Sequence, residues 1–306
     1  MHPFLETLRK YAESNVNTLL LLSIAFGFFV PFLDSTPNWV VTLCLAGVMF
    51  CSCAKITIES VKELRLQTPA WFYLIRYLAV PALLFWILSP ISLPLAAAVL
   101  LITLAPSGVA APAITELVGG SVVFSLFMTA ATNLLFVLVA PFFLSAILGK
   151  SVPIDATSLF MNLLCVIVVP ILLFRLVQWK TPSAVARIKK ACPSVSVALI
   201  CLMIVIIVAR LRSLLLADPS TLALDFALIF AAYSANYLLF GWALGFRETR
   251  ITRNAMAVAS GVNNIALVIV ISVLYFSAEV QRLMIMGEIV WIAAIPVYRA
   301  VLSRIG

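Results

Sequence analysis

The sequence predicts an all-α polytopic membrane protein with ten transmembrane helices in two inverted five-helix repeats. Three observations carry this prediction. Hydrophobic residues make up 64% of the 306 residues and charged residues 10%, whereas soluble domains have about 45–50% and about 25%. Apolar runs recur along the whole chain, and the tripeptide Ser-Gly-Val interrupts two of them, 153 residues apart. Basic residues gather on one predicted side of the membrane.

Ten apolar runs are long enough for a transmembrane helix, which needs roughly 17–25 residues. They cover residues 16–33, 38–57, 70–89, 94–117, 121–148, 157–178, 191–211, 222–245, 254–276 and 282–303. A short polar link near residue 150 separates the fifth run from the sixth. We therefore expect a first five-helix repeat over 1–150 and a second over 151–306. Because each half holds an odd number of spans, the second half enters the membrane from the opposite side, and the repeats are inverted.

The distribution of Lys and Arg predicts the orientation. If the N-terminus lies inside, the inner segments hold fifteen basic residues and the outer segments four, which are Lys150, Arg210, Arg212 and Arg282. Because the basic side of a membrane protein is usually cytoplasmic, we expect both termini in the cytoplasm. The short loops favour a bacterial inner membrane. The net charge of +8 is thus explained by orientation and does not indicate nucleic acid.

Enzyme and metal chemistry find little support in the sequence. The only histidine is His2, and the six cysteines lack paired CxxC spacing, so neither a zinc site nor a disulfide framework is indicated. No nucleophile–base pair can be named. We expect a protein that is not an enzyme and has no cofactor or metal, with the exception of Na⁺ as a coupling ion.

The two interrupted runs contain the candidate binding site. Gly, Pro, Ser and Asn occur where a membrane helix is broken, and breaks at matching positions of two halves point to a transporter's binding site. Half-helices would begin near Val109 and near Asn263, and their free N–H groups and positive dipole ends suit a small organic carboxylate. The alternative is a chance repeat, since Gly and Pro are common in membrane helices. The candidate substrate residues are Ser107, Gly108, Val109, Ala110, Gly261, Asn263, Asn264 and, inside the third run, Arg76.

Several motifs are spread over the first half of the chain, namely Gly47-Val48-Met49-Phe50, Ile58-Glu59, Pro81, Leu104-Ala105-Pro106-Ser107-Gly108 and the stretch Gly120 to Thr129. Through these motifs the chain resembles the bile acid–sodium symporter (BASS) family. The ninth-helix motif of the family, Glu-x-Gly-x-Gln-Asn-x-Gly-Leu, corresponds to residues 259–267, and its fourth-helix motif, Pro-Gly-Gly-Thr-Ala-Ser-Asn, to residues 106–112. Both match in part, as in a divergent member.

The resemblance implies a panel domain (spans 1, 2, 6 and 7) and a core domain (spans 3–5 and 8–10), with spans 4 and 9 crossing mid-membrane. The core would move against the panel and expose the substrate to each side in turn. By position, Ser125, Thr129 and Asn263 match residues of the family's sodium sites, and Asn264 matches a substrate-side asparagine. Alternatively, the hydroxyls of Ser125 and Thr129 bond back into their own helix.

Three departures from the family pattern bear on the coupling ion. The ninth-helix glutamate that touches both sodium ions corresponds to Ala259, and the fourth-helix Ser-Asn pair corresponds to Ala111-Pro112. The third-helix glutamine beside the second sodium corresponds to Arg76. In the family, two sodium ions and one glutamate give the site a net charge of +1. In this chain Arg76, with Ala259 in place of the glutamate, gives the same net charge without sodium. Arg76 could therefore be a tethered replacement for the ion or a substrate contact, or it could snorkel to the cytoplasm.

Glu288, in the last run, is a second charge inside a span. It could pair with Arg76, carry a proton, since low-dielectric surroundings favour a protonated carboxyl, or face a water-filled vestibule. Three functions stay open: a symporter of a small organic anion with sodium, a sodium-independent (proton-coupled or uncoupled) anion transporter, and a membrane protein that binds a ligand without moving it. The expected partners are the anion, such as a ketoacid or another monocarboxylate, and the lipid bilayer. The sequence does not indicate the oligomeric state.

Overall fold

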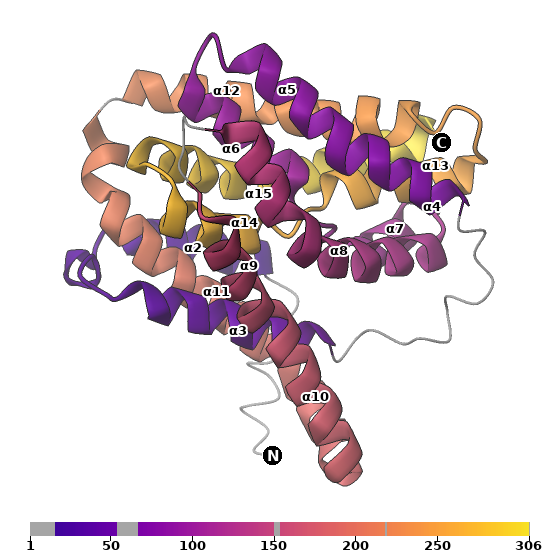
Figure 1. The fold of residues 1–306 in the computed structure, drawn as a ribbon, viewed down its shortest axis with the longest axis horizontal. Helices are drawn as coiled ribbons and strands as arrows, with labels where there is room; N and C mark the ends of the chain where they lie inside the picture. Colours follow the sequence, from indigo (N-terminus) through magenta and orange to yellow (C-terminus); the bar gives the residue numbers. More distant parts are fainter. Residues whose placement is uncertain (1–15, 54–66, 150–153, 218, 306) are drawn as a thin grey trace. The chain divides into compact units, whose positions relative to one another are not determined.

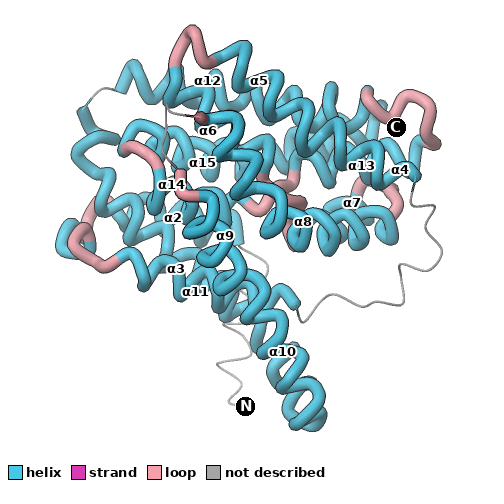
Figure 2. The backbone as a smooth tube through the Cα atoms, in the orientation of Figure 1, coloured by secondary structure: helices cyan, strands magenta, loops and turns pink. Residues whose placement is uncertain are grey.

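The computed structural model describes residues 16–53, 67–149, 154–217 and 219–305, and the regular elements in this part of the chain are helices (Figure 2). The prediction of an all-helical protein is therefore confirmed for these residues. Several residues used for the orientation and the family motifs lie outside them, namely Arg9, Lys10, Lys55, Ile58, Glu59, Lys62, Arg65 and Lys150.

Among the described residues, six helices are long and apolar enough to cross a membrane. They are Gln67–Leu88, Val122–Leu148, Ala156–Lys180, Pro182–Ser213, Thr221–Ala243 and Ala278–Ile305. Four shorter apolar helices, Thr18–Gly27, Asn38–Cys51, Leu93–Leu104 and Ile265–Tyr275, fall in the first, second, fourth and ninth predicted runs. The number of spans and the inverted repeat stay predictions, since length and apolarity alone identify six.

The chain divides into two compact units, and the first combines Met1–Ile56 with Met161–Ala217. Its elements are α2 (Val16–Gly27), η1 (Pro31–Leu33), α3 (Asn38–Cys53), the π-helical segment η4 (Leu164–Val168), α10 (Val169–Lys180) and α11 (Pro182–Ala217). Helix α9 (Ala156–Leu163) spans the boundary between the units. The long helix α11 packs against α2 and α3, and α10 packs against α3.

Small residues allow the helices of the first unit to approach one another closely. A Cβ added at Gly27 of α2 would lie 2.7 Å from Cβ of Val208, and one added at Gly47 of α3 would lie 2.6 Å from Cδ1 of Leu199. Glycine at such contacts is typical of helix packing inside membranes, where close approach gives the van der Waals contact that lipid would otherwise supply.

The second unit combines Thr57–Phe160 with Asp218–Gly306 and holds the two interrupted runs. Its elements are α4 (Gln67–Phe72), η3 (Tyr73–Ala79), α5 (Val80–Leu88), α6 (Leu93–Leu104), α7 (Ala111–Leu117), α8 (Val122–Leu148), α12 (Pro219–Ser234), η5 (Ala235–Ala243), α13 (Arg250–Gly261), α14 (Ile265–Tyr275) and α15 (Ala278–Ile305). Within this unit α6, α14 and α15 pack together, and α13 packs against η5, α7 and α8 (Figure 1).

Two helices of the second unit change to π-helical geometry where they carry polar side chains. The segment η3 ends just before Pro81, which has no N–H to give to the helix, and η5 contains Gly241. A Cβ at Gly241 would lie 2.5 Å from Cα of Ala257 in α13, so glycine lets η5 touch the α13 backbone. Single π-helical turns inside membrane helices are often found at functional sites, and both segments lie beside the interrupted runs.

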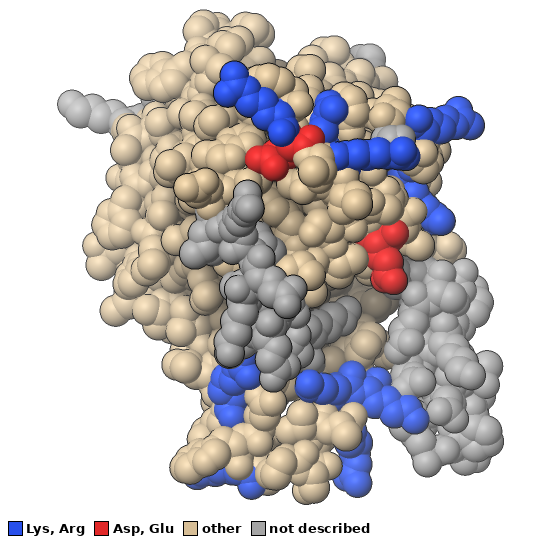
Figure 3. All heavy atoms as spheres, turned by 90° about the vertical axis from the view of Figure 1, so that its right-hand side faces the viewer, with Lys and Arg blue, Asp and Glu red and all other residues tan. Residues whose placement is uncertain are grey.

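Charged side chains occupy a small share of the surface. On the face drawn in Figure 3, Lys, Arg, Asp and Glu form a few patches, and the broad surface around them carries other residue types. Large apolar side chains are correspondingly exposed, among them Phe29, Trp39, Trp86 and Trp179. A surface of this kind suits contact with lipid rather than with water.

Candidate functional site

The two Ser-Gly-Val stretches are breaks in helices, as their residue types predict. Helix α6 ends at Leu104 and α7 starts at Ala111, while α13 ends at Gly261 and α14 starts at Ile265. Pro106 and Pro112 have no backbone N–H and prevent the first helix from continuing. At the second break the side chain of Asn264 accepts a hydrogen bond from the N–H of Leu267 at 3.4 Å, which is an N-cap of α14.

The two breaks pair with each other. Ser107 and Asn263 form an isolated antiparallel bridge. The N–H of Gly108 donates to the carbonyl of Val262 at 2.7 Å, and the N–H of Asn264 donates to the carbonyl of Pro106 at 2.7 Å. Segments that are far apart in the sequence thereby satisfy backbone groups that the broken helices leave free.

Glycine is required at both breaks because other groups come too close for a side chain. A Cβ at Gly108 would lie 2.9 Å from the carbonyl oxygen of Asn263, and a Cβ at Gly261 would lie 2.3 Å from the ring of Tyr237. The first contact permits the bridge, and the second lets η5 cover the end of α13.

A polar stripe on α8 supports the first break. The hydroxyl of Thr132 accepts from the N–H of Ser107 at 3.0 Å, and the Ser107 and Thr129 hydroxyl oxygens lie 3.3 Å apart. The amide of Asn133 donates to the carbonyl of Ser107 at 2.9 Å and accepts from Asn264 at 3.3 Å. The stripe thus joins α8 to both breaks.

Two buried oxygens beside these contacts have no hydrogen-bond partner among the described residues. They are Oγ of Ser125, one helical turn before Thr129, and Oδ1 of Asn263. The amide nitrogen of Asn263 donates to the carbonyl of Ile102 at 2.6 Å, which fixes the side chain and leaves its oxygen free. Because an unpartnered buried oxygen costs free energy, each of these two is a candidate ligand for a cation.

Arg76 lies in η3 and is fully buried. Its guanidinium donates to the carbonyl of Thr103 at 2.5 Å and to the carbonyl of Ser260 at 2.6 Å, and its Nε also donates to the Ser260 hydroxyl. Cζ lies 4.8 Å from the centre of the Tyr77 ring. The side chain therefore points to the ends of α6 and α13 and does not extend to an exposed surface.

Glu288 of α15 is buried as well, with 3% of its surface exposed. Its Oε2 has no hydrogen-bond partner among the described residues. The carboxyl therefore lies inside the protein with one oxygen that no described residue satisfies.

The structure brings together most of the residues that the sequence singled out. Arg76, Ser107, Gly108, Thr129, Gly261, Asn263 and Asn264 belong to one connected cluster of contacts, and Ser125 lies one turn from it on α8. Val109 is half-buried and Ala110 is exposed, so these two form the accessible edge of the first break. The N–H groups of Ser107, Gly108 and Asn264 are already used within the cluster.

Three polar side chains in the cluster were not predicted from the sequence, namely Tyr77, Thr132 and Asn133, while Ser260 was predicted as part of the second break but not as a site residue. Two of the three had a detectable signal: with Ser125 and Thr129, the residues Thr132 and Asn133 fall on one face of a helix. The hydroxyl of Tyr77 donates to the carbonyl of Ala259 at 2.6 Å, and a contact between a side chain and a distant backbone group leaves no local sequence pattern.

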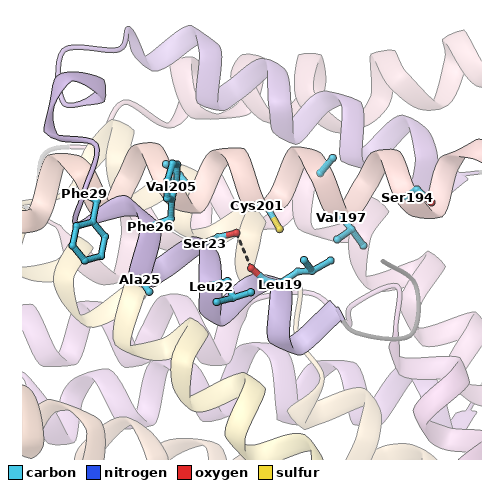
Figure 4. A pocket seen from close by; sticks show the side chains of 11 residues that line it. Leu19, Leu22, Ser23, Ala25, Phe26, Phe29, Ser194, Val197, Cys201 and Val205 are labelled. Carbon is cyan, nitrogen blue, oxygen red and sulfur yellow. Dashed lines mark hydrogen bonds between the residues drawn. The ribbon is translucent and has the colours of Figure 1, made fainter. Parts of the chain in front are cut away.

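A separate groove in the first unit does not fit an anionic substrate. It has a volume of about 600 Å³ and is lined by α2 and α11, largely with apolar side chains such as Leu22, Phe26 and Val197 (Figure 4). The Ser23 hydroxyl in its wall donates to the Leu19 carbonyl at 2.8 Å. The groove thus offers mainly apolar surface, and the paired breaks stay the better candidate.

Comparison with known proteins gives one family and several distant relatives. The model of the Sodium Bile acid symporter family matches residues 42–218. The probable sodium/metabolite cotransporter BASS2, chloroplastic, of Oryza sativa subsp. japonica is 28% identical over 170 residues, which are 55% of this chain and 41% of the relative. The probable sodium/metabolite cotransporter BASS1, chloroplastic, of Arabidopsis thaliana is 22% identical over 248 residues, 79% of this chain and 60% of the relative.

A bacterial relative is matched over a larger share of its length. The uncharacterized sodium-dependent transporter YocS of Bacillus subtilis (strain 168) is 26% identical over 283 residues, which are 89% of this chain and 87% of the relative. The matched regions cover less than two thirds of the two plant relatives but most of the bacterial one.

Proposed function

Because the chain belongs to the sodium bile acid symporter family, we propose that it is a secondary active transporter that moves a small organic anion together with sodium. Family membership and the six long apolar helices identify an integral membrane protein of a transporter family. The relatives described above are named as transporters, which agrees with the expectation that the chain is not an enzyme.

The pairing of the two helix breaks is the observation that carries the proposal. A bridge between Ser107 and Asn263 joins two interrupted helices from the two halves of the chain. In secondary transporters, broken helices of this kind form the substrate and ion sites near the bilayer midplane. We place the transport site at the paired breaks.

The proposed architecture is the ten-helix inverted repeat, with discontinuous spans 4 and 9 crossing mid-membrane. The division of the chain supports it, since one unit holds the helices of predicted spans 1, 2 and 7 and most of span 6, and the other holds those of spans 3–5 and 8–10. The first would be the panel and the second the core. Alternating access would follow if the core moved relative to the panel and carried the paired breaks with it.

The proposed substrate is a small carboxylate at the accessible edge of the breaks. Three N–H groups of the breaks are used within the protein, and that of Leu267 is capped by Asn264. The anion would therefore be bound by the remaining N–H groups in the first turn of α14 and by the backbone at Val109 and Ala110. The positive end of the α14 dipole favours a negative group. Helix α14 has eleven residues, so two full turns follow the first turn and contribute to its dipole.

The proposed sodium site is formed by Ser125, Thr129 and Asn263. The free oxygens of Ser125 and Asn263 are of the type that hard cations bind. The Thr129 hydroxyl lies 3.4 Å from the carbonyl oxygen of Gly108, so a backbone oxygen is within reach. A bound sodium ion would give the two oxygens the partner that the described residues do not supply.

Proton coupling through Glu288 is the second candidate. Its carboxyl is buried with an unpartnered oxygen, and a protonated carboxyl tolerates such surroundings much better than a carboxylate. The proposed location is a bacterial inner membrane with both termini in the cytoplasm, which rests on the distribution of Lys and Arg.

Uptake into proteoliposomes tests the proposal. We would measure uptake of labelled monocarboxylates, 2-oxoacids and hydroxyacids under an inward gradient of sodium chloride or of choline chloride. Saturable uptake that needs sodium supports symport, and uptake driven only by a pH gradient supports the second candidate. Counterflow of the same acid distinguishes a transporter from a protein that only binds its ligand, because exchange requires movement across the membrane.

A further inference from the structure

A single guanidinium joins the C-terminal ends of two broken helices. Thr103 lies in the last turn of α6 and Ser260 in the last turn of α13. Arg76 donates to the backbone carbonyls of both, at 2.5 and 2.6 Å. It also donates to the hydroxyl of Ser260, so three of its hydrogen bonds end on neutral oxygens of the two helix ends.

The C-terminal end of a helix attracts positive charge. Each end carries roughly half a negative elementary charge on its free carbonyls, and in transporters the ends of broken helices together with unwound carbonyls coordinate cations. At the paired breaks two such ends meet at one point inside the protein. A cation is therefore favoured there, and the described structure places the guanidinium of Arg76 at that point.

The surroundings hold the side chain in place. The Tyr77 ring lies 4.8 Å from Cζ of Arg76, a distance at which a ring face stabilises a cation. The Ser260 hydroxyl donates onward to the carbonyl of Asn236 at 2.7 Å, which leaves its oxygen free to accept from Arg76. The position is thus built to keep a planar cation.

We propose that the Arg76 guanidinium is a tethered cation, which fills the position at the ends of α6 and α13 that a mobile sodium ion would otherwise occupy. The inference rests on the proposed function in one respect, namely that the paired breaks form the transport site. The inference predicts the number of sodium ions bound per chain. One ion binds at Ser125, Thr129 and Asn263, and no second ion binds at the helix ends.

Direct binding of ²²Na⁺ to the purified protein in detergent tests this inference. Wild type is expected to bind one sodium ion per chain, and a variant with both Ser125→Ala and Thr129→Ala none. Arg76→Gln removes the charge and adds a side-chain oxygen, so it is expected to bind one ion more in either background. Arg76→Lys keeps the charge and should gain none, as should the exposed Arg247→Gln. Size-exclusion chromatography would establish that each variant is folded.

Two results would overturn the inference. One is a folded Arg76→Gln protein that gains no sodium ion. The other concerns the double variant Ser125→Ala, Thr129→Ala, in which Arg76 is intact. The inference is wrong if this protein still binds a sodium ion and if the further substitution Ser260→Ala abolishes that binding. The second result needs no variant of Arg76 and decides the matter if Arg76→Gln does not fold. If wild type binds no sodium and Arg76→Gln binds one, the tethered cation is supported while the proposed sodium site is refuted.

Discussion

Ser107 and Asn263 lie 156 residues apart in the sequence and pair as an antiparallel bridge at the point where two helices are broken. The hydrogen bonds run between their neighbours, from Gly108 to Val262 and from Asn264 to Pro106. In an antiparallel pair this pattern places the two central residues at a non-hydrogen-bonded position, where Cα atoms are about 4.5 Å apart and side chains are close. The bridge and its two hydrogen bonds hold the two breaks against each other.

Cysteines at these two positions are expected to form a disulfide. The spacing falls within the range of about 4.4–6.8 Å between Cα atoms that a disulfide allows. We would introduce Ser107→Cys and Asn263→Cys together in a variant without the six native cysteines, oxidise it with copper phenanthroline, and detect the linked peptides by mass spectrometry. Pairing Ser107→Cys with Ser272→Cys, in the C-terminal half of α14, serves as the control. A link of equal yield in the control would speak against the bridge.

Removal of the Asn133 side chain is expected to weaken the connection between α8 and the breaks. Its amide donates to the carbonyls of Ser107 and Thr129 at 2.9 and 2.7 Å. Side-chain hydrogen bonds in membrane proteins contribute about 0.6 kcal/mol each and at most about 1.7, so Asn133→Ala should cost about 1–2 kcal/mol. Chemical denaturation in detergent measures this cost. Thr42→Ala, whose hydroxyl bonds only within its own helix, should change stability much less.

Gly261→Ala is expected to destabilise the protein, whereas Gly287→Ala should be tolerated. The added Cβ at Gly261 meets the Tyr237 ring at 2.3 Å, while the nearest atom at Gly287 is the flexible end of Ile102 at 3.3 Å. Overpacking of this kind costs about 1–3 kcal/mol. Thermal unfolding of both variants gives the comparison. Addition of Tyr237→Leu to Gly261→Ala should restore part of the loss, and strictly additive effects would contradict the contact.

Glu288→Gln is expected to leave the protein at least as stable as wild type. Its carboxyl is buried with a free oxygen, and a neutral amide avoids the cost of a buried charge. The difference should grow as pH rises from 5 to 8, since only the wild-type side chain can ionise. Thermal unfolding over this pH range is the measurement, with the exposed Glu279→Gln as control. If Glu288→Gln is less stable than wild type at every pH, the carboxylate has a stabilising partner and the interpretation is wrong.

The sequence predicts the breaks but not all the contacts that hold them. Pro106, Gly108 and Gly261 mark the interruptions because proline and glycine act on the local backbone. The pairing of Ser107 with Asn263 depends on contacts between the two halves of the chain, which no local pattern reveals. The family resemblance implied only that spans 4 and 9 cross. The acceptors of Arg76 are backbone carbonyls, and since every residue has one, the sequence cannot single them out. Asn133 was detectable, because it continues the polar face of Ser125 and Thr129.

The sodium dependence of thermal stability tests the central claim most directly, namely that the free oxygens beside the paired breaks bind the coupling ion. A ligand that binds only the folded state adds about 2.7 kcal/mol at a hundredfold excess over its Kd. Sodium chloride, compared with equal choline chloride, is predicted to raise the unfolding temperature of wild type and of Ser272→Ala, but not of Ser125→Ala. Both serines are fully buried, yet the Ser272 hydroxyl donates to Ile269 in its own helix, whereas the Ser125 hydroxyl has no partner among the described residues. An equal response in all three proteins, or no sodium-specific response in wild type, would contradict the claim.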